Sequence, residues 1–299
     1  MASCGVYVRG KFSWNLKVCH PFELLCSPAR TPSRHNVGCK RAKERKRYTM
    51  TEPINFDKVA DIYDYYVNVL FDVPFFMNET KHTDKPILEL MCGTGRISIP
   101  LLEAGRELVC VDYSQGMLDK FSEKTTDKAY KLTMLNADVS SLSLNRKFDT
   151  IILPFHSLQE IITNEKQISA LKAIYNHLSD DGVFICTLQN PKVRLQNADG
   201  LIRTMGKYET SDNKDLIISY SNFYQNGLVT GFQYYEIYDK ENRLTEKRHL
   251  EINFRPITIE DFKNMLGGAG FKIAEIFGNY DYSKFDAEKS SFMLFRLIK

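Results

Sequence analysis

A glycine-rich turn lies between a short apolar run and the helical pattern that comes after it. The sequence there reads Ile87-Leu-Glu-Leu-Met-Cys-Gly-Thr-Gly-Arg96, which is typical of a buried strand that ends in a tight turn before a helix. Gly93 and Gly95 let the backbone bend sharply and let a ligand approach it without a side chain in the way. A lone Gly-x-Gly is a weak signal, and its place directly after a strand makes this turn a candidate ligand site.

Two acidic residues follow the next two apolar segments. Asp112 comes directly after segment 107–111, where it can accept hydrogen bonds from both ribose hydroxyls of an adenosine-bearing cofactor. Asp138 follows segment 132–135, where it can accept a hydrogen bond from an adenine amino group. Each acid alone is equally consistent with a helix cap or an ordinary loop. Because the carboxyl ends of parallel strands line one crevice, the turn and the two acids together predict one cofactor site.

The hydrophobic pattern predicts the sheet that would bring these residues together. Short apolar runs alternate with helical patterns, which indicates a mostly parallel sheet with helices on both faces. The predicted strands are 86–91, 107–111, 132–135, 150–153, 183–188, 271–277 and 292–298. Segment 56–76 has aromatic residues at helical spacing, and we expect one helix there that ends before Pro74.

The pattern changes after Asn190. Three long segments, 216–224, 228–238 and 244–254, follow with no helix between them, and Asn226-Gly227 is a hairpin signal. We therefore expect an antiparallel insertion over about residues 203–255. It is rich in aromatic residues, so we expect one face to cover the active site. The alternative is plain sheet packing or a dimer surface, which leaves a homodimer open.

These motifs together resemble the class I S-adenosylmethionine-dependent methyltransferase family. The resemblance is carried by Glu89–Gly95, by Val111-Asp-Tyr-Ser114 with Met117-Leu118, and by Asn136-Ala-Asp138, and it extends over about residues 55–299. It implies an α/β fold with a doubly wound, mostly parallel seven-stranded sheet. The last strand of that sheet would be reversed, and the antiparallel β insertion would lie over the active site.

The resemblance also implies roles for individual residues. The Glu89–Gly95 turn would hold the methionine part of S-adenosylmethionine, Asp112 the ribose, and Asp138 with Val139 the adenine. Two neighbours of Asp112 are implied as further cofactor contacts, Tyr113 and Met117. Members of the family often carry a Tyr-Asp pair on an amino-terminal lid helix, and Tyr63-Asp64 matches it. The alternative for that pair is the surface of a helix.

His156 is the predicted catalytic residue. It follows the fourth predicted strand, whose end faces the transferring methyl group in the family, and histidine is suited to exchange a proton near pH 7. The alternative is a histidine that packs and makes hydrogen bonds without chemistry. A neutral amine can attack the sulfonium carbon directly, so amine methylation needs no base beyond correct positioning.

The first 49 residues differ in charge from the rest of the chain. They hold 11 basic and two acidic residues, whereas residues 50–299, the predicted methyltransferase domain, hold 29 and 35. Residues 1–49 are consistent with a cleaved organellar targeting segment, with a tail that binds an acidic partner, or with upstream sequence before a start at Met50. The cysteines of the domain lie in or beside apolar runs, as reduced cysteines do, so we expect a cytoplasmic protein unless residues 1–49 direct it to an organelle.

Composition narrows the possible functions. No run of about 18 apolar residues occurs, which argues against a membrane-spanning helix. The mildly acidic domain argues against nucleic acid as a partner, and the absence of a Cys-x-x-Cys pair argues against a zinc site. A nicotinamide dehydrogenase would need a third glycine or alanine where Ser98 stands, and a Tyr-x-x-x-Lys pair that is absent from its expected place.

The sequence therefore predicts transfer of a methyl group from S-adenosylmethionine to a small-molecule nucleophile. An amine is favoured over a hydroxyl, because the insertion resembles the lids of small-molecule methyltransferases that act on amines, amino acids and amino sugars. One alternative is a methyltransferase for RNA or protein. Another is a catalytically silent S-adenosylmethionine-binding partner of a different enzyme.

Overall fold

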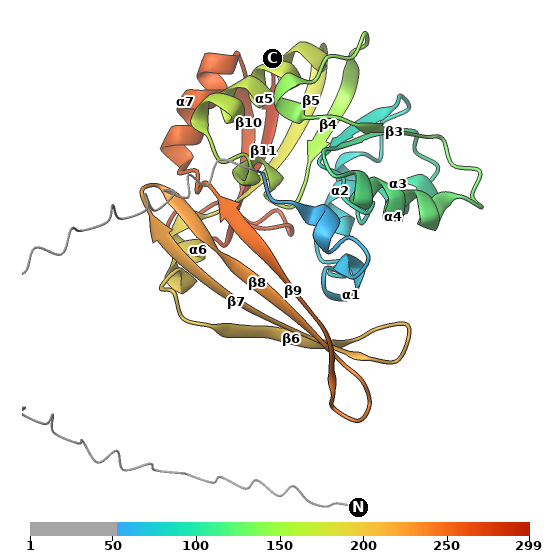
Figure 1. Ribbon diagram of the computed structural model, residues 1–299. Helices are drawn as coiled ribbons and strands as arrows, with labels where there is room; N and C mark the ends of the chain where they lie inside the picture. The colour runs from blue at the N-terminus through green and yellow to red at the C-terminus, as the bar shows by residue number, and fades with distance from the viewer. Residues whose placement is uncertain (1–52) are drawn as a thin grey trace, which may run out of the picture. The chain divides into compact units, whose positions relative to one another are not determined.

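The computed structural model describes residues 53–299 of the chain (Figure 1). The interpretations of residues 1–49 therefore lie outside the described residues, and the boundary near Met50 stays a prediction. Within residues 53–299, none of the helices combines the length and the apolar character that crossing a membrane requires.

A seven-stranded sheet forms the centre of the fold. Its strand order is β10-β11-β5-β4-β1-β2-β3. Strands β1 to β5 are parallel to their neighbours among themselves, and β11 runs antiparallel to both β5 and β10. The predicted sheet with a reversed last strand is confirmed. The strands are β1 (Ile87–Leu90), β2 (Leu108–Asp112), β3 (Leu132–Asn136), β4 (Phe148–Leu153), β5 (Leu178–Gln189), β10 (Lys272–Phe277) and β11 (Phe292–Ile298).

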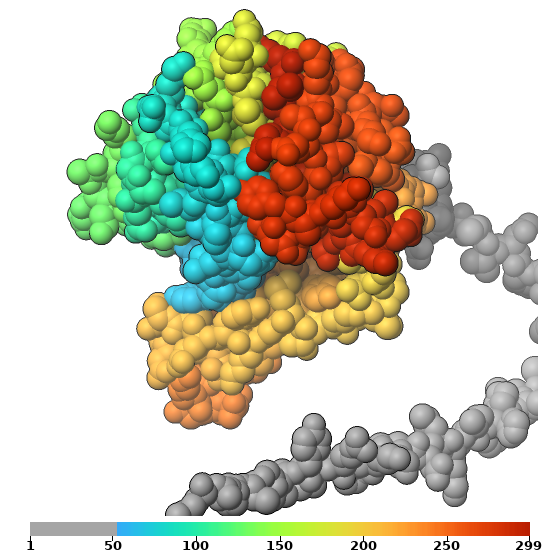
Figure 2. All heavy atoms as spheres, turned by 180° about the vertical axis from the view of Figure 1, so that it is seen from behind, coloured from blue at the N-terminus to red at the C-terminus, as the bar shows by residue number. Residues whose placement is uncertain are grey.

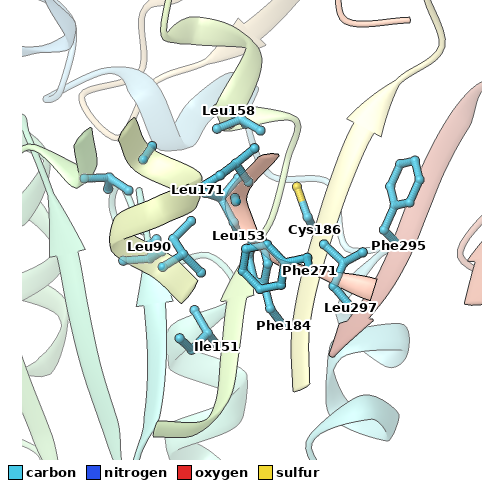
Figure 3. Close-up of a cluster of buried hydrophobic side chains, with 14 of the residues drawn as sticks. Leu90, Ile151, Leu153, Leu158, Leu171, Phe184, Cys186, Phe271, Phe295 and Leu297 are labelled. Atoms are coloured by element: carbon cyan, nitrogen blue, oxygen red, sulfur yellow. The ribbon is translucent and has the colours of Figure 1, made fainter. Parts of the chain in front are cut away.

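Helices cover both faces of this sheet, because alternate residues of the strands are buried on opposite sides. Leu88 and Leu90 pack with α5 (Asn164–His177) and α7 (Ile259–Ala269). Ile87, next to Leu88, belongs to the cluster on the other face. That face is covered by α2 (Val73–Glu79), α3 (Ser98–Glu103) and α4 (Gln115–Thr125). Figure 3 shows the first cluster, in which Leu153, Phe184 and Cys186 of the strands lie near Leu171 of α5 and Phe271.

Side-chain caps fix where three of these helices begin. Ser114 accepts a hydrogen bond from the backbone N–H of Met117 at the start of α4, as the sequence predicts. Thr163 caps α5 and Thr258 caps α7 in the same way. Each cap satisfies a backbone donor that has no partner inside its helix. The cap at Ser114 places the start of α4 three residues after Asp112.

The single helix predicted over residues 56–76 is wrong. The segment forms three short pieces, η1 (Phe56–Lys58), α1 (Tyr63–Tyr66) and α2. Pro74 lies in the first turn of α2, where its missing N–H removes no helical hydrogen bond. Pro74 therefore marks the start of a helix and not the end of one.

A second, four-stranded sheet lies between β5 and α7 in the chain. Its order is β6-β7-β8-β9, and every pair is antiparallel. Asn226 and Gly227 both have positive φ angles, which suits the tight hairpin between β7 and β8. The predicted antiparallel insertion is thus confirmed, with one more strand than expected. The strands are β6 (Arg203–Glu209), β7 (Asp215–Gln225), β8 (Leu228–Tyr238) and β9 (Leu244–Phe254).

The amino-terminal segment, residues 53–67, packs against this second sheet. Val59, Ile62 and Tyr66 are buried in one cluster with residues of β7, β8 and β9, among them Leu216 and Tyr235. Figure 2 shows this blue segment meeting the gold and orange sheet. The Tyr66 hydroxyl also lies 3.0 Å from that of Tyr235, which anchors the segment by a buried hydrogen bond. The second sheet therefore helps to hold the segment in place.

Candidate active site

A cleft opens at the carboxyl ends of β1 to β4, with about 1220 Å³ of free space including solvent at its mouth. It lies where the strand order reverses, since β2 lies on one side of β1 and β4 on the other, and ligands commonly bind at such a point. Of the ten site residues that the sequence predicts, eight line it and two, Gly95 and His156, do not. The eight are Tyr63, Glu89, Gly93, Asp112, Tyr113, Met117, Asp138 and Val139.

The two glycines of the turn have different structural roles. Both have positive φ angles, which favour glycine. A Cβ on Gly93 would meet only open space, so its backbone borders the cleft where a ligand can approach. A Cβ on Gly95 would lie 2.4 Å from the ring of Phe121 in α4. Gly95 thus allows α4 to pack closely, and its predicted contact with the cofactor stays a prediction.

Asp112 is oriented by the backbone around it. Its carboxylate accepts hydrogen bonds from the N–H of Gly93 at 2.7 Å and of Ser114 at 2.8 Å. Burial raises the pKa of Asp112, and these hydrogen bonds to the ionised form oppose the rise. A carboxylate has about four acceptor positions, so the side chain can still accept from a ligand hydroxyl. Its place at the end of β2, in the wall of the cleft, suits the predicted ribose contact.

Asp138 both caps a short helix and borders the cleft. Its Oδ1 accepts hydrogen bonds from the N–H and the hydroxyl of Ser140, at 2.8 and 2.7 Å, and so caps η2 (Val139–Ser141). Among the described residues, Oδ2 has no hydrogen-bond partner and remains available to an amino group. Val139 is buried beside it and adds an apolar surface on which a flat ring can pack. The capping alternative and the adenine role are therefore compatible.

Glu89 is a buried acid on the floor of the cleft. Ser98 donates a hydrogen bond of 2.7 Å to its carboxylate. Burial raises the pKa of Glu89 to about 8, because the charged form loses its hydration. A ligand that brings positive charge or amino groups would stabilise the ionised form. Three acids, Glu89, Asp112 and Asp138, together with the open backbone at Gly93, fit S-adenosylmethionine, whose sulfonium, amino groups and ribose hydroxyls suit acidic partners.

Hydrogen bonds and an ion pair hold the amino-terminal segment against this cleft. Asp57 accepts hydrogen bonds from the Ser114 hydroxyl at 2.6 Å and from the N–H of Gly116 at 2.8 Å. Asp64 accepts one from the Thr94 hydroxyl at 2.5 Å and pairs with Lys124 at 2.7 Å. These contacts hold Tyr63, which lies between the two aspartates in sequence, in the wall of the cleft. The predicted lid position of Tyr63-Asp64 thus fits the geometry, while its role in binding stays a prediction.

A second hollow, which we call the acceptor chamber, adjoins the cleft. Phe56, Tyr63, Phe155 and Glu160 are among the residues that line both. The rest of its wall comes from residues 53–71, from the region after β4, from β5 with the short helix after it, from β11 and from the second sheet. It is mainly apolar, with the aromatic rings of Tyr66, Phe71, Phe254 and Phe292, and it carries the polar side chains of His156, Gln159, Gln189, Arg194 and Gln233.

His156 lines this chamber and not the cleft. Its ring stacks on Phe292 with centroids 5.3 Å apart and an interplanar angle of 8°. Burial lowers the pKa of His156 to about 3, so the ring is neutral near pH 7. Its Nδ1 is buried and has no hydrogen-bond partner within residues 53–299. Its catalytic role stays a prediction.

Glu160 was not predicted from the sequence. It ends η3 (Ser157–Glu160), in the same short segment as His156, and lines both the cleft and the chamber. Burial raises the pKa of Glu160 to about 8, with a smaller contribution from Asp112, and the carboxylate forms no ion pair with any described residue. An acid shortly after a strand is a common feature of loops. Only the position of Glu160 between the two cavities distinguishes it.

Residues 87–182 match the family model described as "Methyltransferase domain". The chain is 24% identical over 204 residues to the putative methyltransferase YqeM of Bacillus subtilis (strain 168). The aligned region covers 65% of this chain and 76% of that protein. It is also 24% identical over 227 residues to the glycine/sarcosine N-methyltransferase of Aphanothece halophytica, and this alignment covers 75% of this chain and 80% of that protein.

Solved structures share the fold. A S-adenosylmethionine-dependent methyltransferase from Clostridium acetobutylicum ATCC 824 superposes with a TM-score of 0.68 at 24% identity, covering 81% of this chain and 98% of that one. The sugar N-methyltransferase KedS8 from Streptoalloteichus sp ATCC 53650 superposes with a TM-score of 0.65 at 16% identity, covering 89% of this chain and 100% of that one. The domain match runs from β1 into β5 and thus includes the turn and the three acids Glu89, Asp112 and Asp138. The domain match, the methyltransferase relatives and the shared fold together support a class I S-adenosylmethionine-dependent methyltransferase.

Proposed function

We propose that this enzyme methylates the amine of a small molecule that binds in the acceptor chamber. The observation that carries the proposal is the wall shared by the chamber and the cofactor cleft, with Glu160 in it. A small molecule suits the chamber because the amino-terminal segment, the region after β4 and the second sheet all contribute to its wall. The same enclosure disfavours RNA or a folded protein as the acceptor.

The chemistry of the wall favours an amine over a hydroxyl. When bound, S-adenosylmethionine supplies an electrophilic methyl group on a sulfonium. Aromatic rings and a carboxylate attract an ammonium group. Glu160, whose pKa burial raises to about 8, can pair with that ammonium and take its proton to leave the neutral amine. In-line positioning of the amine would then complete the requirements for transfer.

His156 remains our predicted catalytic residue, and Glu160 is a second candidate for the same proton. The low pKa of His156 makes its neutral ring a weak base. Its stacked ring is nevertheless well placed to orient an acceptor in the chamber. The pH dependence of activity in variants at each position distinguishes the catalytic roles of the two residues.

The names of several relatives agree with an amine acceptor. The Aphanothece halophytica relative is named for the N-methylation of glycine and sarcosine, and KedS8 for that of a sugar. A 27% identical relative from a Streptomyces species, matched over 161 residues, is named as a cypemycin N-terminal methyltransferase. These names support nitrogen as the acceptor atom and do not select one acceptor.

The proposal is tested by supplying S-adenosylmethionine with an isotopically labelled methyl group and a panel of small amines with their matched alcohols. We expect label in amines and none in alcohols. Label only in alcohols would contradict the preference for nitrogen, and label only in added RNA or protein would contradict a small acceptor. If S-adenosylhomocysteine binds but no acceptor of any kind is labelled, the protein is the catalytically silent partner considered from the sequence.

A further inference from the structure

Arg194 is a partly buried cation in the acceptor chamber with no acidic partner among the described residues. It ends α6 (Pro191–Arg194), directly after β5, and lines the chamber but not the cofactor cleft. Its Nε is fully buried and has no hydrogen-bond partner within residues 53–299. Burial lowers the pKa of Arg194, and no carboxylate offsets this effect.

Such a group is unfavourable unless something compensates its charge. A guanidinium stays protonated at any physiological pH, and a buried charge without a partner is strongly destabilising. Glu160 lines the same chamber but does not serve as that partner, because Arg194 has no part in setting its pKa. The chamber therefore contains one acid and one cation that do not neutralise each other.

The orientation of Arg194 suits a ligand. Its guanidinium lies over the ring of Phe254 at the end of β9, 4.7 Å from the ring centroid. Stacking holds the planar group in place through its face and leaves the N–H donors at its edge free. A fixed fork of donors matches the two oxygens of a carboxylate or of a phosphate.

The cofactor does not explain Arg194. The arginine that lines the cofactor cleft is Arg96, which is already paired with the buried Asp72 through two contacts of 2.5 and 2.7 Å. Arg194 lies in the wall of the chamber beyond it, close enough to His156 to lower the pKa of that ring. Its charge is thus directed at the part of the site that we assign to the methyl acceptor.

We propose that Arg194 binds an oxyanion of the acceptor, a carboxylate or a phosphate-like group, while Glu160 holds the acceptor's amine. The acceptor is then a small molecule with a cationic and an anionic end, such as an amino acid. This inference rests on the proposed function, because it assumes that the acceptor lies in the chamber.

The test compares acceptors that share an amine at one end and differ only in the group at the other end. Alkylamines, ω-amino carboxylates and ω-amino phosphonates with one to four chain carbons are supplied with labelled S-adenosylmethionine. We expect kcat/KM to be at least about tenfold higher for one anionic series than for the alkylamines, which corresponds to one well-formed charged contact. Comparison of the two anionic series shows which oxyanion is bound.

Arg194→Gln should remove this advantage through a higher KM for the anionic acceptors, with a much smaller effect on the alkylamines, which lack the oxyanion. Arg194→Lys should retain part of it, because the charge remains while the two-pronged geometry is lost. Lys192→Gln is the matched control. It removes one positive charge from the same short helix, where Lys192 is exposed and paired with Glu288, and it should keep the full preference.

A binding measurement separates this inference from the proposed function. 3-Aminopropanoate is titrated by calorimetry into protein saturated with S-adenosylhomocysteine. We expect binding to wild type and Lys192→Gln, and at least about tenfold weaker binding to Arg194→Gln. If this pattern holds but no amine is methylated, the oxyanion site stands and the proposed function fails.

Three results would overturn the inference. Alkylamines could be methylated as well as their anionic counterparts, which leaves the proposed function intact. Arg194→Gln and Arg194→Lys could both keep the wild-type preference and the wild-type affinity for 3-aminopropanoate. Arg194→Gln could instead lose affinity for S-adenosylhomocysteine itself, which would assign the residue to the cofactor.

Discussion

The three acids of the cofactor cleft differ in how firmly the fold holds them. Asp112 is fixed by two backbone N–H groups, and Asp138 by the backbone and hydroxyl of Ser140, whereas Glu89 has one hydroxyl partner. Backbone donors position a carboxylate without the loss of side-chain freedom that a flexible partner would bring. Asp112 is accordingly the best-oriented of the three, and its removal should have a clear effect on cofactor affinity.

Asp112→Ala should weaken the binding of S-adenosylhomocysteine by about 1–3 kcal/mol, because ligand hydroxyls lose their acceptor. Calorimetry measures this, and wild type should bind no NAD. Asp119→Ala is a suitable control, since Asp119 is an acid on α4 that lies outside the cleft. Equal affinities in wild type and Asp112→Ala would exclude Asp112 from the cofactor site.

The proton acceptor is identified by a pH profile. Burial raises the pKa of Glu160 to about 8, so its carboxylate becomes available as the pH rises through that value. With cofactor at saturation, kcat/KM for the acceptor should rise through about pH 8 and then level off. Glu160→Gln should lower it by about a hundredfold or more and remove the contribution of this group to the profile.

His156→Asn should keep the rise near pH 8, because burial places the pKa of His156 near 3, far below this range. If His156→Asn removes the rise and Glu160→Gln does not, His156 is the proton acceptor, as we predicted from the sequence.

At the scale of elements, the second sheet supports two parts of the site at once. Its strands β8 and β9 contribute Gln233, Ile252 and Phe254 to the chamber. The same strands bury the amino-terminal segment through Tyr235 and Leu250. The sheet thus lines the chamber directly, whereas none of its residues lines the cofactor cleft.

Replacing residues 203–255 by a short linker should abolish methyl transfer and preserve the binding of S-adenosylhomocysteine, with a moderate loss of affinity as Tyr63 loses support. Calorimetry and a transfer assay measure the two effects, and circular dichroism checks that the main sheet remains folded. Persistent transfer would show that the insertion serves packing alone. Complete loss of cofactor binding in a folded protein would place the insertion in the cofactor site.

Sequence patterns predict those elements whose burial alternates or is continuous. The bounds of β8, β9 and β11 agree with the predicted segments, because turn signals bound β8 and β9 and because β11 is an apolar run that is buried over most of its length. Strand β6 was missed, since Arg203–Glu209 is mostly polar and has no buried residue. The amino-terminal helix was misjudged, because its aromatic spacing reflects contacts with the second sheet as well as helical turns.

The same limit applies to the site. The acids Asp112 and Asp138 could be predicted because Asp112 ends a strand and Asp138 lies two residues beyond the next one, and the place of both strands in the sheet is known. Glu160 and Arg194 could not, because they lie on short helical turns with no period. Their meaning depends on which charges surround them in three dimensions, and residues far apart in the chain decide that.

At the scale of the whole molecule, the chain from Pro53 onward contains every core cluster that we describe. The two clusters of the main sheet and the cluster of the second sheet draw on residues from Ile54 to Leu297. We predict that a chain starting at Met50 melts at the same temperature as the full chain. Calorimetric melting curves test this, and a drop of several degrees in Tm would show that residues 1–49 pack on the domain.

The amino-terminal segment has one consequence for how the two ligands influence each other. Asp57 and Asp64 connect it to the cofactor side, and Asp61 connects it to Arg248 of β9. Phe56 and Tyr63 border both cavities. A ligand that orders this segment lowers the entropic cost for the other, so the two should bind with positive cooperativity. Thermodynamic linkage then requires one factor for both directions: acceptor must tighten S-adenosylhomocysteine as much as S-adenosylhomocysteine tightens acceptor.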